Sequence, residues 1–402
     1  MNAAVVRVGL SAVGRNATSA APPPLLDPVG PRVVLGAPPA ADGLAEPLAP
    51  SAISLFGPRG ACRLDDGALW ISDTGHHRLL GWARTPQNDH APADWLIGQA
   101  DFAREGRNGG GAPGPATVNV PTGVCGADGG LVVADAWNHR VLIWRRAPRA
   151  SHVPADVVLG QADFFSNEPN RGGAPNAATL HWPYGVTWDG TFLWVADSGN
   201  RRVLRWRGLP EHSGAPADLV LGQPDFERRD ENGGVGAGAA TMRWPHAIAV
   251  GAGRLYLADA GNSRVMIWHR TPAANGAPAD WLLGQDRVDG CDHNRGQYWP
   301  DAAALHMPYG IAANTRGVCV ADTANSRLLA WPHQDASALG APATALSGQA
   351  TFADKGDNGW QLPTRASLSW PYGIALSGEL AVVADSGNNR VLLWPLAAAW
   401  AP

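Results

Sequence analysis

Six short segments of this sequence share a proline that is followed by a residue of variable chemistry. The segments are "LFGPRG" (55–60), "VNVPTG" (118–123), "LHWPYG" (180–185), "MRWPHA" (242–247), "LHMPYG" (305–310) and "LSWPYG" (368–373). The residue after the proline is Arg59, Thr122, Tyr184, His246, Tyr309 or Tyr372, and the residue two before it is Phe56, Asn119, His181, Arg243, His306 or Ser369. Phenol, imidazole and guanidinium groups form directional hydrogen bonds, and imidazole can also exchange protons or bind metals.

Eight of these residues are the candidates for a binding rim, provided that the fold brings them together. They are Arg59, His181, Tyr184, Arg243, His246, His306, Tyr309 and Tyr372. Convergent polar and aromatic groups around a concave surface are typical of a ligand or peptide site. The alternative is that the tyrosine rings pack on neighbouring loops with their hydroxyl groups satisfied.

A metal site is a further alternative, because His181, His246 and His306 occur in three consecutive repeats. Spacing by whole repeats is weak evidence for it, and no local cluster of metal ligands accompanies these histidines. We therefore predict no metal and no other cofactor, and we assign no catalytic residue.

A ten-residue repeat indicates which elements position these groups. It reads "DTGHHRLLGW" (73–82), "DAWNHRVLIW" (135–144), "DSGNRRVLRW" (197–206), "DAGNSRVMIW" (259–268), "DTANSRLLAW" (322–331) and "DSGNNRVLLW" (385–394). Each Asp is followed by Arg after five residues and by Trp after nine, at repeat spacings of 62, 62, 62, 63 and 63. Because one binding site would not require sixfold repetition, we interpret Asp, Asn and Arg as turn-forming scaffold: Asp accepts N–H groups of the turn, and Asn adopts a left-handed backbone.

Four short apolar runs occur in each unit, exemplified by "DVVLG", "WPYGVTW", "LWVAD" and "RVLIW". Short runs rich in Val, Leu, Ile and Trp are typical of strands when they are flanked by Gly, Pro, Asn and Asp. They are apolar on both faces, so each sheet must be covered on both sides. The prediction is an all-β, six-bladed β-propeller of four-stranded antiparallel sheets, in which each repeated Trp fills the gap between blades.

The N-terminal strand is expected to close the ring. A run "VVLGA" (33–37) precedes the first repeated Asp, and the chain ends soon after the last "RVLLW" run. Residues 31–36 should therefore supply the outermost strand of the final blade, leaving no open edge. We predict a flexible leader and Pro-rich linker over residues 1–30 and a propeller over residues 31–402.

The segments "VADAWNHRVLIW" and "ADSGNNRVLLW" resemble NHL repeats, which are named for the Asn-His-Leu segment that corresponds to "NHRVL" at 138–142. The resemblance covers about residues 31–394, although these units are longer than common NHL blades. It implies a six-bladed propeller and a binding role. Amidating lyases with an NHL-type ring use a channel metal with His ligands, but no local motif here matches theirs, so none of those residues is carried over.

Bulk composition restricts the functional classes. The formal net charge is −4 and the chain has four cysteines. Such a charge gives no general attraction to nucleic acid or to anionic membranes, and the scattered cysteines do not make a disulfide framework. No apolar stretch is long enough to span a membrane, and the N-terminal segment only weakly resembles an export signal. We expect a monomeric cytoplasmic protein with no membrane association.

Three functions remain open from the sequence. The first is a binding or scaffolding module for a protein or small ligand on the long-loop face. The second is an enzyme of the lyase or hydrolase type with a His/Tyr site at the channel mouth, with or without the assistance of a metal. The third is RNA binding through the arginines of residues 140–207, which the lack of interleaved aromatic residues disfavours. We favour the first, without an enzymatic activity.

Overall fold

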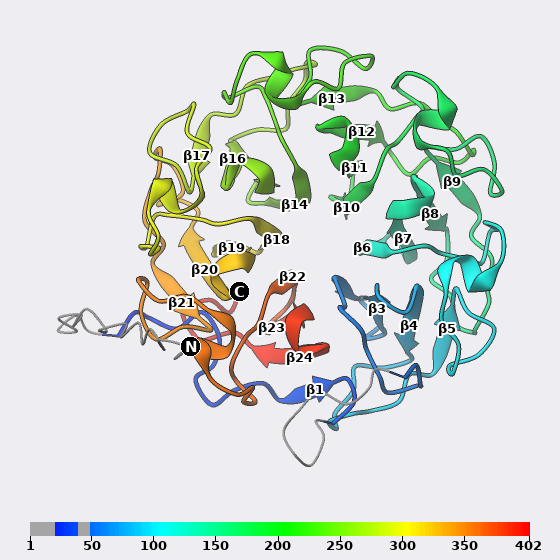
Figure 1. Cartoon of the computed structure of the whole chain (residues 1–402), viewed down its shortest axis with the longest axis horizontal. Helices are drawn as coiled ribbons and strands as arrows, with labels where there is room; N and C mark the ends of the chain where they lie inside the picture. The colour runs from blue at the N-terminus through cyan, green and yellow to red at the C-terminus, as the bar shows by residue number, and fades with distance from the viewer. Residues whose placement is uncertain (1–20, 39–48) are drawn as a thin grey trace, which may run out of the picture.

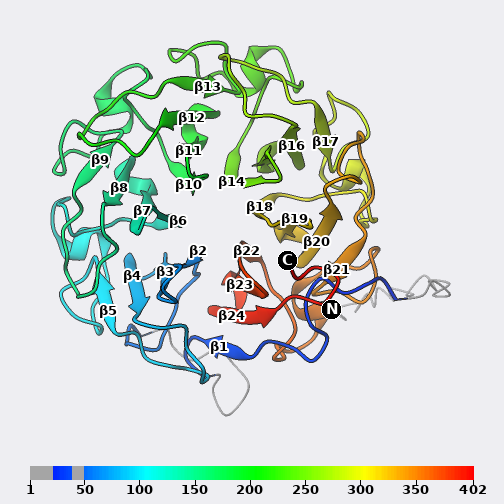
Figure 2. The ribbon, with the colours of Figure 1, turned by 180° about the vertical axis from the view of Figure 1, so that it is seen from behind.

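The computed structural model describes residues 21–38 and 49–402 of the chain. This part of the chain forms six four-stranded antiparallel sheets and contains no α-helix. The sheets stand around a central axis like the blades of a propeller (Figures 1 and 2). The predicted fold class is confirmed.

The strands of each blade follow chain order outward from the axis, except that β1 from the N-terminal end is the outermost strand of the last blade. The innermost strands are β2 (Gly60–Arg63), β6 (Pro121–Ala127), β10 (Pro183–Trp188), β14 (Pro245–Gly251), β18 (Pro308–Ala313) and β22 (Pro371–Ser377). The second strands are β3 (Leu69–Asp73), β7 (Gly130–Asp135), β11 (Phe192–Asp197), β15 (Arg254–Asp259), β19 (Gly317–Asp322) and β23 (Leu380–Asp385). The third strands are β4 (Arg78–Trp82), β8 (Arg140–Trp144), β12 (Arg202–Arg207), β16 (Arg264–Trp268), β20 (Arg327–Pro332) and β24 (Arg390–Pro395). The outermost strands are β5 (Trp95–Ile97), β9 (Val157–Leu159), β13 (Leu219–Leu221), β17 (Trp281–Leu283), β21 (Ala345–Ser347) and β1 (Val33–Leu35).

The hydrophobic core lies between neighbouring sheets, which explains why the strands are apolar on both faces. The second and third strands are buried along almost their whole length, as in β7 and β8. The Trp that ends each third-strand repeat is buried, and its indole N–H secures a loop. Trp144, for example, donates from Nε1 to the carbonyl of Val153 at 3.0 Å.

The N-terminal strand β1 closes the ring, as predicted. It pairs antiparallel with β24, with Val34 opposite Leu392. The same segment lies beside the last blade in both views (Figures 1 and 2). The outer edge of the last blade is thereby covered.

Packing also extends to residues that we had assigned to the linker. Leu25 and Leu26 are 0% and 1% exposed. The N–H of Leu25 donates to the carbonyl of Leu346, and Trp394 Nε1 donates to the carbonyl of Asp27 at 2.8 Å. Residues 24–27 therefore contact the last two blades, whereas residues 1–20 of the expected leader lie outside the described residues.

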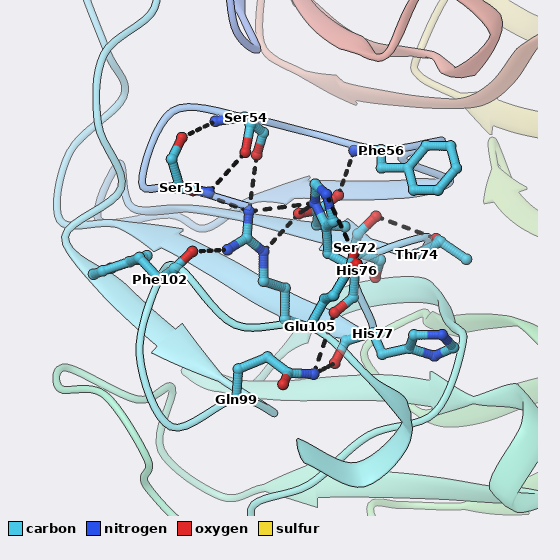
Figure 3. A network of polar contacts seen from close by, with 12 residues as sticks. Ser51, Ser54, Phe56, Ser72, Thr74, His76, His77, Gln99, Phe102 and Glu105 are labelled. Carbon is cyan, nitrogen blue, oxygen red and sulfur yellow. Dashed lines mark hydrogen bonds and ion pairs between the residues drawn. The ribbon is translucent and has the colours of Figure 1, made fainter. Parts of the chain in front are cut away.

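The repeated Asp, Asn and Arg form a buried network in each blade. In the third blade, Asp197 Oδ2 accepts from Arg202 Nε at 2.8 Å and from Asn200 Nδ2 at 2.7 Å. Arg202 also donates to the backbone carbonyls of Asn176, Thr179 and Phe226. In the first blade His76 replaces the Asn (Figure 3). Arg78 of that blade donates to the backbone carbonyls of Ser54 and Phe102. The scaffold role that we predicted fits these contacts.

Two details differ from the expected turn chemistry. Asp197 Oδ1 accepts the N–H of His181, 16 residues earlier, instead of an N–H of its own turn. The left-handed residue is Arg201 (φ 53°), one position after Asn200. Asn200 instead exchanges two side-chain hydrogen bonds with Asn170 in the preceding loop. The motif therefore ties two loops to one turn, the loop between β9 and β10 and the loop between β13 and β14, which explains its repetition.

Candidate ligand-binding site

Five side chains from five blades contact one another across the propeller axis. All five occupy the position after the aligned proline, where the innermost strand begins. Ring centroids lie 4.6 Å apart for Tyr372 and Tyr309, 4.3 Å for Tyr309 and His246, and 4.7 Å for His246 and Tyr184. The Arg59 guanidinium closes the circle, 4.7 Å from the Tyr372 centroid and 6.0 Å from that of Tyr184. We call these five residues the axial layer.

The second blade contributes no ring to the axial layer. Its equivalent residue is Thr122, which is buried and donates from Oγ1 to the Tyr184 carbonyl at 2.8 Å. This short side chain leaves room beside Tyr184, and Arg59 extends across it. The layer is therefore asymmetric, with the only guanidinium of the layer between Tyr372 and Tyr184.

The axial layer separates two cavities. One, of about 330 Å³, runs along the innermost strands and is lined by residues that include Cys62 and Cys125. The other, of about 550 Å³, lies on the side of the turns between second and third strands, with Gly199 and Gly387 in its wall. All five residues of the axial layer line both cavities, so they form the floor of each. We call the larger one the mouth cavity.

Three tryptophans form the wall of the mouth cavity: Trp182, Trp244 and Trp370. Each precedes the aligned proline of its blade, and they are 43%, 43% and 41% exposed. Trp182 and Trp370 have left-handed backbones, with φ of 50° and 47°. Left-handed geometry is unfavourable for a bulky residue, and such strain is concentrated at functional sites. Gly57, Val120 and Met307 share this backbone at the equivalent position, so it belongs to the repeat, and the three exposed indoles around one cavity are what marks a candidate binding site.

The charges around the mouth cavity are all positive. Its lining contains Arg59 and Arg201 and no Asp or Glu. Burial lowers the pKa of His246 to about 4, and its Nδ1 lies 3.1 Å from the Trp244 carbonyl. Burial also raises the pKa of Tyr309 and of Tyr372. At neutral pH the floor therefore presents one guanidinium, a neutral imidazole and neutral phenols.

The structure brings together most, but not all, of the eight candidate residues. Arg59, Tyr184, His246, Tyr309 and Tyr372 form the axial layer, and His181 lies in the wall of the mouth cavity. Arg243 points elsewhere and pairs with Glu231 at 3.1 Å. His306 stacks on His293 at 4.6 Å. Neither of them lines either cavity.

The three histidines considered as metal ligands do not converge. His181 lies beside His139, with ring centroids 5.1 Å apart, while His246 is in the floor and His306 is beside His293. Within residues 21–38 and 49–402, no group of three His, Cys, Asp or Glu side chains could hold a metal ion.

Sequence reasoning missed the three tryptophans. The signal was present, because the residue before the aligned proline is Gly57, Val120 or Met307 in three blades and Trp in the other three. We had considered only the Trp that ends each ten-residue repeat. The residue type varies between blades at this aligned position, as it does at the position that forms the axial layer. The same reasoning would therefore have selected the tryptophans.

Comparison with known proteins supports the fold. No protein-family model matches the chain, and no curated protein matches its sequence. A structural genomics protein of unknown function from Bacteroides thetaiotaomicron is similar in structure, with a TM-score of 0.50 and 13% identity over 86% of this chain and 71% of that chain. Kuenenia stuttgartiensis hydrazine synthase matches at a TM-score of 0.48 and 13% identity, covering 86% of this chain and 97% of that one. Staphylococcus aureus virginiamycin B lyase matches at 0.44 and 11%, covering 85% and 96%.

The likeness at a TM-score of 0.50 is one of fold alone and says nothing of activity, because the identity is 13%. Among the described residues, no helix has the length and apolar character that crossing a membrane requires.

Proposed function

We propose that this propeller is a binding module that takes up a small ligand in the mouth cavity. The observation that carries the proposal is the cup formed by Trp182, Trp244 and Trp370 above the axial layer. Its volume, about 550 Å³, is within the range of small-molecule sites, roughly 300–1,000 Å³. The floor closes the channel at this level, so a ligand is held on the loop face. The repeated "D-x-x-N-x-R" turn also supports our hypothesis that the blades are NHL repeats.

An enzyme at the same place is less well supported. A general acid or base works best when its pKa is near the operating pH. His246, with a pKa near 4, holds little of the protonated form at neutral pH. Tyr309 and Tyr372, whose pKa values burial raises, are poor proton acceptors there. The floor is chemically suited to hydrogen bonding and stacking.

RNA binding through residues 140–207 finds no support in the placement of the arginines. Arg140 and Arg202 are fully buried in the scaffold networks. Arg205 is 8% exposed and pairs with Asp218. Three of the nine arginines are thus withdrawn from the surface, whereas Arg145, Arg146 and Arg149 are exposed.

A substitution that fills the cavity provides the test. Gly57 lines the mouth cavity, has a φ of 51°, and has open space around its Cβ position. Trp182 and Trp370 have nearly the same φ at the equivalent position, so Gly57→Trp should be accommodated with a fourth indole in the cup. Gly190→Trp is the control, because Gly190 also has open space and lies outside both cavities.

The experiment is a ligand-observed NMR screen of small ring compounds against the three proteins. We expect compounds that bind the unsubstituted chain and Gly190→Trp but not Gly57→Trp. Thermal melts establish that both variants are folded. If the same compounds bind Gly57→Trp with unchanged affinity, or if no compound distinguishes the proteins, the mouth cavity is not the binding site.

A further inference from the structure

We infer that the ligand of the mouth cavity is an anion that carries a planar ring, with its negative group at Arg59 and its ring among the tryptophans. This inference rests on the proposed function and specifies the chemistry of the ligand. Three observations carry it: the charge of the cavity lining, the free bonding capacity of Arg59, and the arrangement of the indoles.

Arg59 and Arg201 differ from the other enclosed arginines of the molecule. The six repeat arginines each form an ion pair with the Asp of their own turn, at 2.7–2.9 Å. In the described part of the chain, neither Arg59 nor Arg201 has a carboxylate within 4.0 Å, and no acid lines the cavity. A charge that is partly withdrawn from water without a counter-charge is costly. An anionic ligand would supply that counter-charge.

Bonding capacity remains on both guanidinium groups. Arg59 is held over the Tyr372 ring and lies 6.0 Å from the Tyr184 centroid, and in the described part of the chain no carboxylate pairs with it. A guanidinium carries five N–H donors and binds a carboxylate or phosphate through two parallel hydrogen bonds. Arg201 donates from Nη1 to the Gly199 carbonyl at 2.6 Å, while its buried Nε has no partner. Arg59, fixed at the floor by stacking, is the better placed anchor.

The tryptophans determine what the rest of the ligand must be. Three indoles at equivalent positions in the third, fourth and sixth blades stand around the floor. Indole faces stack on planar rings and also attract cations. A cation is disfavoured here, because Arg59 and Arg201 lie in the same lining and no carboxylate offsets them. A planar ring that carries an anionic group would stack on the indoles of the wall and pair with Arg59 in the floor.

Three matched probes separate ring from charge. Indole-3-acetate, indole-3-acetamide and tryptamine share one ring and carry a carboxylate, a neutral amide or an ammonium group. Affinities are measured by ligand-observed NMR titration against the full chain, Arg59→Met and Arg104→Met. Arg104 is an exposed surface arginine that pairs with Asp101 and serves as the control.

We expect the acetate to bind the unsubstituted chain at least about tenfold more tightly than the amide, and tryptamine not to saturate. Arg59→Met should reduce the preference for acetate to within about twofold, and Arg104→Met should leave it intact. Added salt should weaken acetate binding more than amide binding in the unsubstituted chain, which tests the charge even if Arg59→Met does not fold.

Three outcomes would overturn the inference in distinguishable ways. If acetate and amide bind equally and Gly57→Trp abolishes both, the cavity binds rings but the anion requirement is wrong. If tryptamine binds best, the cup is a cation site and the charge argument fails. If none of the probes binds and the screen with Gly57→Trp also finds no cavity ligand, both the inference and the proposed function are wrong.

Discussion

The Arg59 guanidinium carbon lies 4.7 Å from the centroid of the Tyr372 ring, so the first and last blades meet at the propeller axis. The same two ends of the ring are also joined at the circumference, where β1 completes the sixth blade beside β24. A ligand seated on Arg59 would therefore contact the seam of the ring. Binding there should stabilise the closed propeller, because a ligand specific for the folded state adds to its stability.

The N-terminal packing should contribute measurably to that closure. Leu25 is 0% exposed, whereas Val29 nearby is 91% exposed. We expect Leu25→Ala to lower the free energy of unfolding by about 2–4 kcal/mol, because it leaves a cavity against the last two blades. Val29→Ala should change it by less than about 0.5 kcal/mol. Urea denaturation checks both, and equal effects would mean that the segment does not hold the ring closed.

The buried Asp–Arg pair of each blade should be worth far more than a surface pair. Arg202 is 0% exposed and bonds Asp197 and three backbone carbonyls. We expect Arg202→Met to cost about 3–5 kcal/mol, because a buried carboxylate loses its counter-charge. Arg104→Met, which breaks an exposed pair, should cost less than about 1 kcal/mol. A cost for Arg202→Met as small as that for Arg104→Met in urea denaturation would contradict the scaffold role.

Much of the fold was predictable because repetition carries it. The sixfold Asp, Arg and Trp spacing indicated the number of blades. The apolar run at 33–37, before the first repeat, indicated how the ring closes. The bonds of Asp197 were not predictable, since its N–H partner is 16 residues away and depends on the position of the loop before β10. Local turn chemistry is visible in sequence, but contacts between loops require the assembled blade.

The candidate site was predictable only in part, for a geometric reason. Side chains alternate between the two faces of a strand, and the second residue of β10, β14, β18 and β22, directly after the proline, lies in the axial layer. Tyr184, His246, Tyr309 and Tyr372 share that position and therefore meet. Arg243 and His306 precede the strands, where the chain has not yet adopted the alternation, so their direction could not be inferred from spacing.

The buried imidazole of the axial layer should make stability depend on pH. Burial lowers the folded-state pKa of His246 to about 4, below the ordinary value of 6.5. Between these values the unfolded chain binds more protons, so stability falls as the pH is lowered from about 6.5 to about 4, by up to ~3 kcal/mol. The positive charge of Arg59 also lowers the pKa of His246, whereas the negative charge of Asp259 raises it.

We expect His246→Phe to reduce this dependence in urea denaturation at a series of pH values. Phe keeps the stacking on Tyr184 and Tyr309 and does not titrate. Tyr309→Phe is the matched control, because it keeps the stack and the histidine, and it should leave the slope unchanged. An identical slope in His246→Phe and the unsubstituted chain would show that this histidine is not responsible.

The backbone of the tryptophan wall offers a test of whether stability has been sacrificed for binding. Trp370 has a φ of 47° and is 41% exposed. Because Gly adopts left-handed geometry freely and Ala does not, Trp370→Gly should be more stable than Trp370→Ala by about 1 kcal/mol. Trp244 is similarly exposed but lacks the positive φ, so Trp244→Gly should be less stable than Trp244→Ala by about 0.5–1 kcal/mol. All four variants should bind cavity ligands more weakly, and the same Gly–Ala order at both positions would refute the backbone argument.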